Sequence, residues 1–257
     1  MTGRVHFIGA GPGAPDLLTL RGCRVLKESQ LVYVAEPYDQ IFAELLVGKE
    51  VRIPFDYYFD ELISQVDEQL KSGNIAFLIP GDLTFYSPFQ ALLDHFSAVA
   101  EVIPGVGTAN AASARLKKTF DLPGVCNRAI IASPRTLGDD NAPTISDLAA
   151  PGVALLIYMN NLPLDQLVAD LRTGYGEDVP IAILHRLCLS GEEIVSGSLD
   201  TIVAQVGDRD FFNLKTADKR PALTLVVVGK TLDTSVDGSW WDYRRDHIWK
   251  FRSGVEK

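Results

Sequence analysis

Short apolar segments alternate with segments of helical character along most of this 257-residue chain. In the first half, the apolar runs are rich in β-branched residues and cover 5–8, 31–35, 51–53, 75–79 and 102–103. Amphipathic stretches separate and follow these runs, at 16–29, 42–47, 59–71, 88–98 and 108–116. This alternation predicts a parallel sheet whose strands are joined by helices.

The segment "DLPGVCN" (121–127) predicts a break in the chain, because Pro-Gly favours a turn. Beyond it, further apolar runs cover 129–132, 153–158, 181–184, 194–198 and 223–228. Helical stretches are expected at 144–149, 164–172 and 199–206. Because the runs 181–184 and 194–198 lie so close together, they favour an antiparallel pair, and the second half is expected to form a mixed sheet.

We therefore predict an α/β fold of two α/β lobes with a cleft between them. The expected limits are 1–120 for the first lobe and 127–232 for the second. A basic and aromatic tail follows at 233–257, and its stretch "DYRRDHIWKFR" concentrates Arg244, Arg245, Lys250 and Arg252.

The composition argues against several classes of function. The formal net charge of −9, from 24 basic and 33 acidic residues, argues against a nucleic-acid or anionic-membrane partner. No apolar stretch approaches the roughly 20 residues that cross a bilayer, and "MTGRVHFIG" runs directly into a predicted strand, so we expect no signal peptide. Cys23, Cys126 and Cys188 fit core residues of a reducing compartment better than disulfides or metal ligands. A cytoplasmic protein without a metal site is expected.

The first apolar run ends in a loop, "GAGPGAPDLL" (9–18), that resembles a dinucleotide-binding turn. The loop matches G-x-G-x-x-G/A at Gly9, Gly11 and Ala14. Glu36 ends the next predicted strand, where such a fold places its ribose-binding acid. However, Pro12 and Pro15 have no N–H to offer a phosphate, and Asp16 at the expected helix start opposes an anion. A plain structural turn and a nucleotide loop both stay open on these residues alone.

Two further strand ends carry glycine with proline nearby. They are "PGDLTFYSPF" (80–89) and "EVIPGVGTANAASA" (101–114). Ligands of open α/β sheets collect at the carboxyl ends of the strands. Three such loops on one rim predict a small-molecule site there.

These three motifs, with "VHFIGAGPGAPDLLTLRG" (5–22) as the first, resemble in order and spacing the signature motifs of the tetrapyrrole methylases. The resemblance continues through "VALLIYM" (153–159), "VPIAILHRLCLSGEEIVSGSL" (179–199) and "PALTLVVVGKTL" (221–232). It implies two α/β lobes, usually in a homodimer, that bind S-adenosylmethionine in the cleft and methylate a small-molecule tetrapyrrole.

Carried over motif by motif, the resemblance implies a set of cofactor-binding residues: Pro12, Gly81, Asp82, Phe85, Gly107, Thr108, Met159, Leu187 and Ala222. A sulfonium cofactor needs no phosphate cradle, so the prolines of the first loop are compatible with it. Because arginine forks suit carboxylates, we expect basic substrate contacts among Arg115, Lys117, Arg135 and Arg186. The general base is not identified, and its candidates are Asp82, His185 and Arg186.

Within the family, "FDLPGVCNRAIIASPRT" (120–136) and "SWWDYRRDHIWKFR" (239–252) look most like precorrin-4 C11-methyltransferases. The chain departs from the family pattern at Leu83, where proline is usual, and at Gly107, where serine is usual. "LSGEE" (189–193) stands where the C11 enzymes commonly have Trp-Pro-Asp-Glu. The alternatives are methylation of uroporphyrinogen III or of another precorrin position, a non-catalytic binding protein, and a nicotinamide-dependent oxidoreductase that uses the first loop and Glu36.

Overall fold

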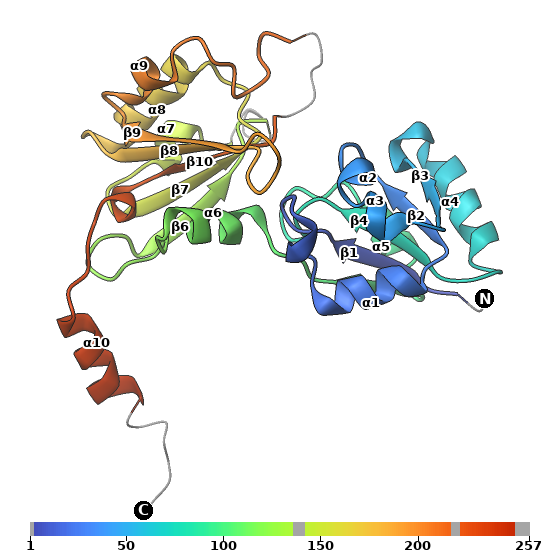
Figure 1. Cartoon of the computed structure of the whole chain (residues 1–257). Helices are drawn as coiled ribbons and strands as arrows, with labels where there is room; N and C mark the ends of the chain where they lie inside the picture. Colours follow the sequence, from blue (N-terminus) through green and yellow to red (C-terminus); the bar gives the residue numbers. More distant parts are fainter. Residues whose placement is uncertain (1–2, 136–141, 217–221, 250–257) are drawn as a thin grey trace, which may run out of the picture.

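The computed structural model describes residues 3–135, 142–216 and 222–249 and shows two sheets, each in a lobe of its own (Figure 1). The first sheet is parallel throughout, in the order β3-β2-β4-β1-β5. Its strands are β1 (Val5–Gly9), β2 (Leu31–Val34), β3 (Glu50–Arg52), β4 (Ile75–Ile79) and β5 (Ala100–Ile103). Its helices are α1 (Leu20–Glu28), α2 (Tyr38–Ile41), α3 (Ala43–Leu46), α4 (Phe59–Gln69) and α5 (Gln90–His95).

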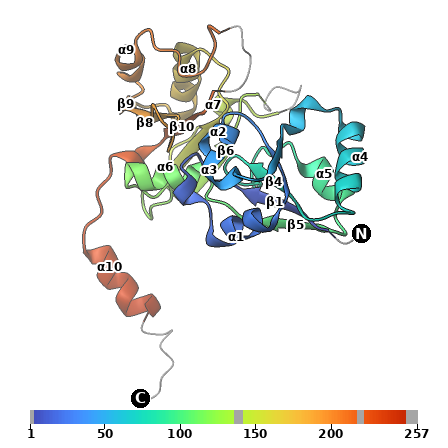
Figure 2. The ribbon, with the colours of Figure 1, turned by 45° about the vertical axis from the view of Figure 1, so that its right-hand side comes forward.

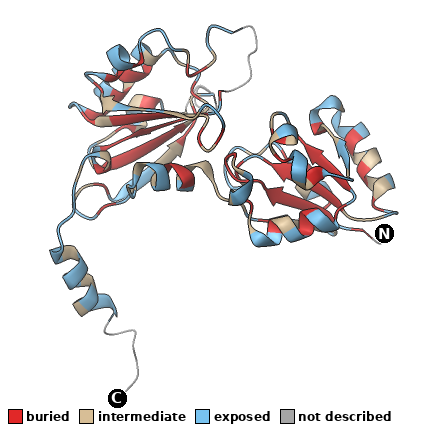
Figure 3. Ribbon diagram, viewed as in Figure 1, coloured by how far each residue is buried: buried red, intermediate tan, exposed pale blue. Residues whose placement is uncertain are grey.

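Side chains alternate between the two faces of this first sheet, and helices bury both faces. Phe7, Tyr33 and Phe77 stack on one face, where α4 and α5 cover them. Ile8 and Leu78 point to the opposite face, which α1, α2 and α3 cover. Figure 3 shows the central strands of both sheets as buried, whereas the edge strand β3 is not. Helices on two faces explain why these strands are continuous apolar runs.

The second sheet is mixed, as predicted, in the order β6-β7-β10-β8-β9. Its strands are β6 (Arg128–Ala132), β7 (Val153–Tyr158), β8 (Pro180–His185), β9 (Glu193–Ser198) and β10 (Thr224–Val228). The β6–β7 pair is parallel, whereas β7–β10, β10–β8 and the expected β8–β9 pair are antiparallel. One face is covered by α7 (Ile145–Leu148), α8 (Leu164–Tyr175) and α9 (Ile202–Val206).

The other face of the second sheet is covered by α6 (Thr108–Leu116), although α6 directly follows β5 of the first sheet. Ala111 and Ala112 of α6 are buried against Leu156, Leu184 and Val227. The segment between β5 and α6 therefore passes from one lobe to the other. The limits 1–120 and 127–232 remain predictions.

The helix expected at 16–29 is two pieces in the structure. Residues Pro15–Leu17 form a 3-10 turn, and α1 begins only after Thr19. The Thr19 side chain accepts a hydrogen bond from the backbone N–H of Gly22 at 3.0 Å, so Thr19, not Asp16, caps the helix. The stretch expected at 42–47 contains α3, and the short helix α2 precedes it without having been predicted.

The C-terminal tail extends away from both lobes (Figures 1 and 2). It contains α10 (Ser239–Arg244) and a π-helical turn, Arg245–Trp249. Trp241 and Tyr243 are exposed on it. Lys250 and Arg252, two of the predicted basic residues, lie outside the described residues. In the described ranges, no helix has the length and apolar character to span a membrane.

The carboxyl ends of β4, β1 and β5 meet backbone to backbone. A Cβ atom placed on Gly105 lies 2.5 Å from the Gly81 carbonyl oxygen and 2.7 Å from the Gly9 Cα. The loops after β1 and β4 also exchange two backbone hydrogen bonds, Gly11 N–H to Gly81 O at 2.9 Å and Gly81 N–H to Gly11 O at 2.8 Å. Close packing of the main chain therefore requires glycine at Gly9 and Gly105, and a φ of 69° favours it at Gly81, whatever ligand binds nearby.

Gly105→Ala tests this contact. The added methyl group would overlap backbone atoms of Gly81 and Gly9, which cannot rotate aside as a side chain can. The free energy of unfolding is therefore expected to fall by about 2 kcal/mol or more. Thermal unfolding followed by circular dichroism measures the change. Gly238→Ala is the matched control, because a Cβ there meets nothing within 4 Å and its φ is −69°. An equal effect of both substitutions would contradict the packing account.

Candidate functional site

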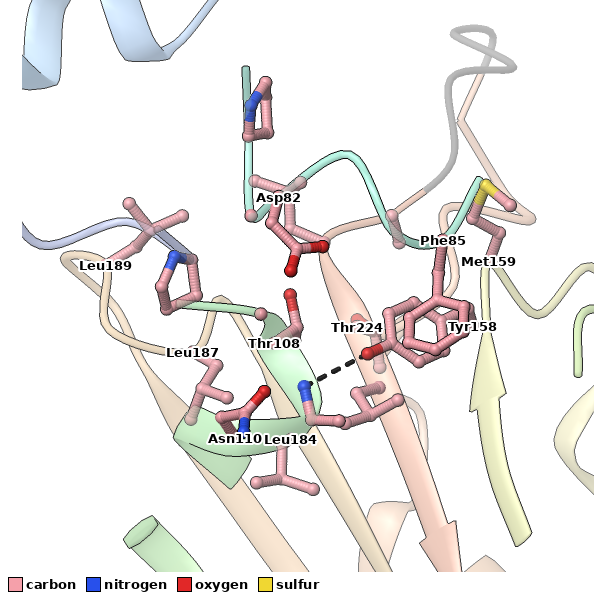
Figure 4. A pocket seen from close by; sticks show the side chains of 18 of the residues that line it. Asp82, Phe85, Thr108, Asn110, Tyr158, Met159, Leu184, Leu187, Leu189 and Thr224 are labelled. Carbon is pink, nitrogen blue, oxygen red and sulfur yellow. Dashed lines mark hydrogen bonds between the residues drawn. The ribbon is translucent and has the colours of Figure 1, made fainter. Parts of the chain in front are cut away.

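A cavity of about 410 Å³ lies where loops of the first sheet face the second sheet and the start of α6 (Figure 4). The loops after β1 and β4 contribute Pro12 and the segment from Pro80 to Phe85. The second lobe contributes the ends of β7 and β8 and the start of β10. The cavity therefore lies at the carboxyl ends of β1 and β4, on the rim where the sequence predicted a ligand.

All nine predicted cofactor-binding residues line this one cavity: Pro12, Gly81, Asp82, Phe85, Gly107, Thr108, Met159, Leu187 and Ala222. They come from six separate segments of the chain. The fold thus brings them together, and their roles in binding stay a prediction.

Several residues in the loops around the cavity have a left-handed backbone conformation. Tyr86, Met159, Arg186 and Cys188 have φ between 49° and 62°, a region that non-glycine residues rarely adopt. Met159 directly follows β7, and Arg186 and Cys188 flank Leu187 after β8. Such conformations cost free energy and persist where the surroundings impose them, which is common at ligand sites.

The lining is apolar apart from a few polar groups, and Asp82 alone among the lining residues carries a charge. Its carboxylate accepts hydrogen bonds from Thr84 N–H and Thr84 Oγ1, both at 3.0 Å. In Figure 4 the carboxylate points toward Thr108 at the start of α6. A carboxylate and apolar walls suit a ligand that carries a positive sulfonium centre and a purine, whereas a pyrophosphate would find no basic side chain among them.

Two lining tyrosines were missed by the sequence analysis. The Tyr38 hydroxyl donates a hydrogen bond to the Pro12 carbonyl oxygen at 2.9 Å, and burial raises the pKa of Tyr38. The Tyr158 hydroxyl accepts the Ala109 N–H at 3.0 Å (dashed in Figure 4), and burial raises the pKa of Tyr158 to about 12. Both phenols are neutral near pH 7 and hold backbone in place. Tyr158 adjoins Met159 in a quoted motif, whereas nothing in the sequence signals Tyr38.

The remaining lining residues also escaped the sequence analysis: Pro80, Ala109, Asn110, Leu184, Leu189, Leu223, Thr224 and Leu225. Four of them, Pro80, Leu184, Leu223 and Leu225, are apolar residues in or beside strand ends, which carry no signal beyond that of a buried strand. Asn110 lies on α6, three residues after Gly107, and a Cβ placed on Gly107 would lie 3.2 Å from its Oδ1. The usual serine of the family would therefore crowd this side chain.

His185, a candidate base, lies behind the cavity wall and does not line it. Its Nδ1 is 2.7 Å from Thr224 Oγ1, and Thr224 Oγ1 donates to the Phe211 carbonyl oxygen at 2.6 Å. Since the hydroxyl proton is already used, His185 must donate from Nδ1, which fixes its tautomer. Burial lowers the pKa of His185, so the ring is neutral near pH 7. In the structure, the His185 ring fixes the Thr224 side chain through this hydrogen bond.

None of the four predicted substrate-binding cations lines the cavity. Arg115 is paired with Glu192, with Nε 3.0 Å from Oε1, and Arg186 Nε donates to the Ser190 carbonyl oxygen at 2.9 Å. Lys117 ends α6 at the opposite end from the cavity, and Arg135 is exposed in a turn after β6. Their contact with a substrate stays a prediction. Glu36, the acid of the nucleotide hypothesis, is exposed and does not line the cavity either.

Comparison with known proteins places these features in a family. The family model of the tetrapyrrole (corrin/porphyrin) methylases matches residues 4–203. The precorrin-4 C(11)-methyltransferase of Pseudomonas aeruginosa is 28% identical to the chain, and the match covers 97% of this chain and 99% of that protein.

Solved structures agree on the fold. A cobalt precorrin-4 methyltransferase superposes with a TM-score of 0.71 at 20% identity, over 90% of this chain and 96% of that one. A uroporphyrin-III C-methyl transferase from Thermus thermophilus, complexed with S-adenosylhomocysteine, gives a TM-score of 0.65 at 21% identity, over 90% of this chain and 99% of that one. The predicted α/β fold of two α/β lobes is confirmed.

The family match covers most of the chain and includes all three glycine loops. It confirms the resemblance seen in the motifs and excludes the nicotinamide-dependent oxidoreductase. The chain belongs to the tetrapyrrole methylases, a family of methyltransferases that use S-adenosylmethionine.

Proposed function

We propose that this enzyme methylates C11 of precorrin-4 or cobalt-precorrin-4 during cobalamin biosynthesis. Methyl transfer is supported by one observation: the nine motif residues line a single cavity whose lining has one carboxylate, that of Asp82. The choice of acceptor is supported by the nearly full-length match to the Pseudomonas aeruginosa C11 enzyme. It is also supported by the sequence of the tail.

In this proposal the cavity holds S-adenosylmethionine. Asp82 lies near the positive sulfonium centre, and Met159, Leu187 and Ala222 form apolar walls for the adenine ring. Thr108 and Asn110 at the start of α6 line the cavity and supply polar contacts. Tyr38 holds the first loop at Pro12, and Tyr158 holds the start of α6 at Ala109, through the hydrogen bonds described above.

S-adenosylmethionine, when bound, supplies an electrophilic methyl group and leaves as a neutral thioether. A ring carbon of the acceptor provides the electron pair for the new C–C bond as the S–C bond breaks. The task of the chain is to align the two reactants and to exclude water, and such alignment is worth roughly 7–11 kcal/mol in favourable cases. Phe85 and Leu223, both exposed and both lining the cavity, offer apolar contact to a flat ring.

Of the three candidates for proton transfer, only Asp82 lines the cavity. His185 is held by Thr224, and the Arg186 guanidinium bonds its own loop. We assign Asp82 to the cofactor, and we infer that the proton displaced from the acceptor leaves to solvent or within the conjugated ring system.

We also propose a cytoplasmic homodimer. The three cysteines are free, as in a reducing compartment. Trp241 and Tyr243 are exposed on α10, which extends away from both lobes, and they suit a second copy of the chain as their partner.

The acceptor is tested by incubating the protein with radiolabelled S-adenosylmethionine and a panel of tetrapyrroles. We expect label on precorrin-4 or cobalt-precorrin-4, and mass spectrometry with carbon-13 NMR should place the methyl group on C11. Label on uroporphyrinogen III alone, or on another precorrin alone, would refute the assigned acceptor while leaving methyl transfer intact.

The role of Asp82 is tested by Asp82→Asn. Removing the carboxylate should weaken the binding of cationic S-adenosylmethionine by about three- to tenfold and that of neutral S-adenosylhomocysteine by less. Calorimetric titration measures both. Asp67→Asn on α4 is the charge-matched control. Equal losses for the two ligands would show that Asp82 does not interact with the sulfonium centre.

Assembly is tested by light scattering coupled to gel filtration. Twice the 28.1 kDa mass of the chain is expected for the wild type. Trp241→Ala should shift the protein toward the monomer, because it removes the largest exposed apolar side chain of α10. Tyr58→Ser, an exposed aromatic position of the first lobe, serves as control. A wild-type monomer at micromolar concentration contradicts the proposal.

A further inference from the structure

Residues 186–192 connect β8 to β9 and form one wall of the cavity through two leucines. Leu187 and Leu189 line the cavity on the side away from Met159 (Figure 4). Both leucines are buried, with 3% and 9% of their surface exposed. The loop is irregular, so the position of these leucines depends on the contacts that the loop residues make.

The backbone of this loop is strained on both sides of Leu187. Arg186 and Cys188 have φ of 50° and 62°, in the left-handed region that non-glycine residues rarely adopt. Such a conformation costs free energy and persists only where neighbouring groups impose it. A group beside the loop must therefore hold Cys188 in place if Leu187 is to face the cavity.

The side chain of Glu192, at the end of the loop, holds Cys188. Its Oε2 accepts the Cys188 N–H at 2.6 Å, and its Oε1 and Oε2 lie 3.0 and 3.3 Å from Arg115 Nε. Hydrogen bonds to a charged group are stronger than those between neutral groups. Because Arg115 belongs to α6, which starts at the cavity, Glu192 joins the middle of the loop to that helix.

The same loop contacts the first lobe. A Cβ atom placed on the buried Gly13, in the loop after β1, would lie 2.5 Å from Leu189 Cδ2 and 2.9 Å from the Cys188 carbonyl oxygen. The two loops therefore touch at Gly13, beside Pro12 of the cavity lining. Movement of residues 186–192 would displace both leucines from the wall and break this contact between the lobes.

We propose that Glu192, oriented by Arg115, is a positioning residue for the cofactor. Its carboxylate keeps residues 186–192 in the conformation in which Leu187 and Leu189 form the apolar wall. The inference rests on the proposed position of S-adenosylmethionine in this cavity. The Arg115 side chain is half exposed, and exposed ion pairs contribute little to overall stability. The effect of Glu192 is therefore expected on ligand binding more than on thermal unfolding.

Glu192→Ala tests the proposal through the affinity for S-adenosylhomocysteine, measured by calorimetric titration of the full chain. The sulfur of this ligand is a neutral thioether, so it does not respond to the lost negative charge. We expect the affinity to fall about tenfold, while the melting temperature stays close to that of the wild type. Glu192→Gln keeps an oxygen that can accept the Cys188 N–H, and its affinity should stay within about threefold of the wild type. Glu193→Ala is the matched control and should leave the affinity unchanged, because that neighbouring carboxylate pairs with Arg209.

Alkylation by iodoacetamide measures the order of the loop without any ligand. Burial raises the pKa of the Cys188 thiol, so alkylation is slow while the loop is in place. In Glu192→Ala, mass spectrometry should show Cys188 alkylated several-fold faster than in the wild type. Cys23, which is half-buried on α1, is the internal reference, and its rate should not change.

Arg115→Gln tests whether the arginine acts through Glu192. It should also lower the affinity for S-adenosylhomocysteine, and the double variant with Glu192→Ala should lose less than the two single losses combined. An affinity equal to that of the wild type would refute this role of Arg115. If Glu192→Ala fails to fold, Arg115→Gln and Glu192→Gln decide the question, because both keep a polar side chain at a partly exposed position.

Unchanged affinity in Glu192→Ala overturns the proposal, and so does unchanged alkylation of Cys188. A wild type that binds no S-adenosylhomocysteine would instead refute the proposed cofactor cavity. The alkylation rates would then still decide whether Glu192 holds the loop.

Discussion

The close contact of three backbone segments, at Gly9, Gly81 and Gly105, determines the shape of the site. These glycines lie at the ends of three adjacent strands, β4, β1 and β5. A side chain on Gly9 or Gly105 would overlap the neighbouring main chain, and Gly81 adopts a φ of 69° that favours glycine. The paired hydrogen bonds between Gly11 and Gly81 then fix the first loop against the second. Everything that the first lobe presents to the cavity is positioned by this contact. The glycine spacing that resembles a dinucleotide motif therefore reflects chain packing.

Charge then decides which ligand class the cavity suits. Its lining has one carboxylate and no basic side chain, and its two tyrosines are held neutral by burial. A pyrophosphate gains little in such surroundings, whereas a sulfonium cation is favoured. Arg115 and Arg186 do not line the cavity. Arg115 forms an ion pair with Glu192, and Arg186 donates a hydrogen bond to the Ser190 carbonyl of its own loop. The negative net charge of the chain is thus compatible with a methyl donor that is a cation.

The fold and nine of the residues that line the cavity were predictable from the sequence, whereas the positions of the expected substrate-binding cations were not. Continuous apolar runs such as 75–79 and 153–158 identify buried strands, and motifs with fixed spacing identify the loops. The helix expected at 16–29 was too long because the cap depends on one hydrogen bond of Thr19. Tyr38 and Thr224 line the cavity through tertiary packing, which leaves no local signal. The direction of Arg115 depends on Glu192, which only the folded chain brings near, and that of Arg186 depends on the conformation of its own loop.

The cavity between the two lobes is expected to bind a sulfur nucleoside and not a dinucleotide. Calorimetric titration of the protein with S-adenosylhomocysteine and, separately, with NADH compares a sulfur nucleoside with a dinucleotide. We predict saturable binding of S-adenosylhomocysteine, one molecule per chain, and no binding of NADH. Binding of NADH without binding of S-adenosylhomocysteine would contradict the central claim.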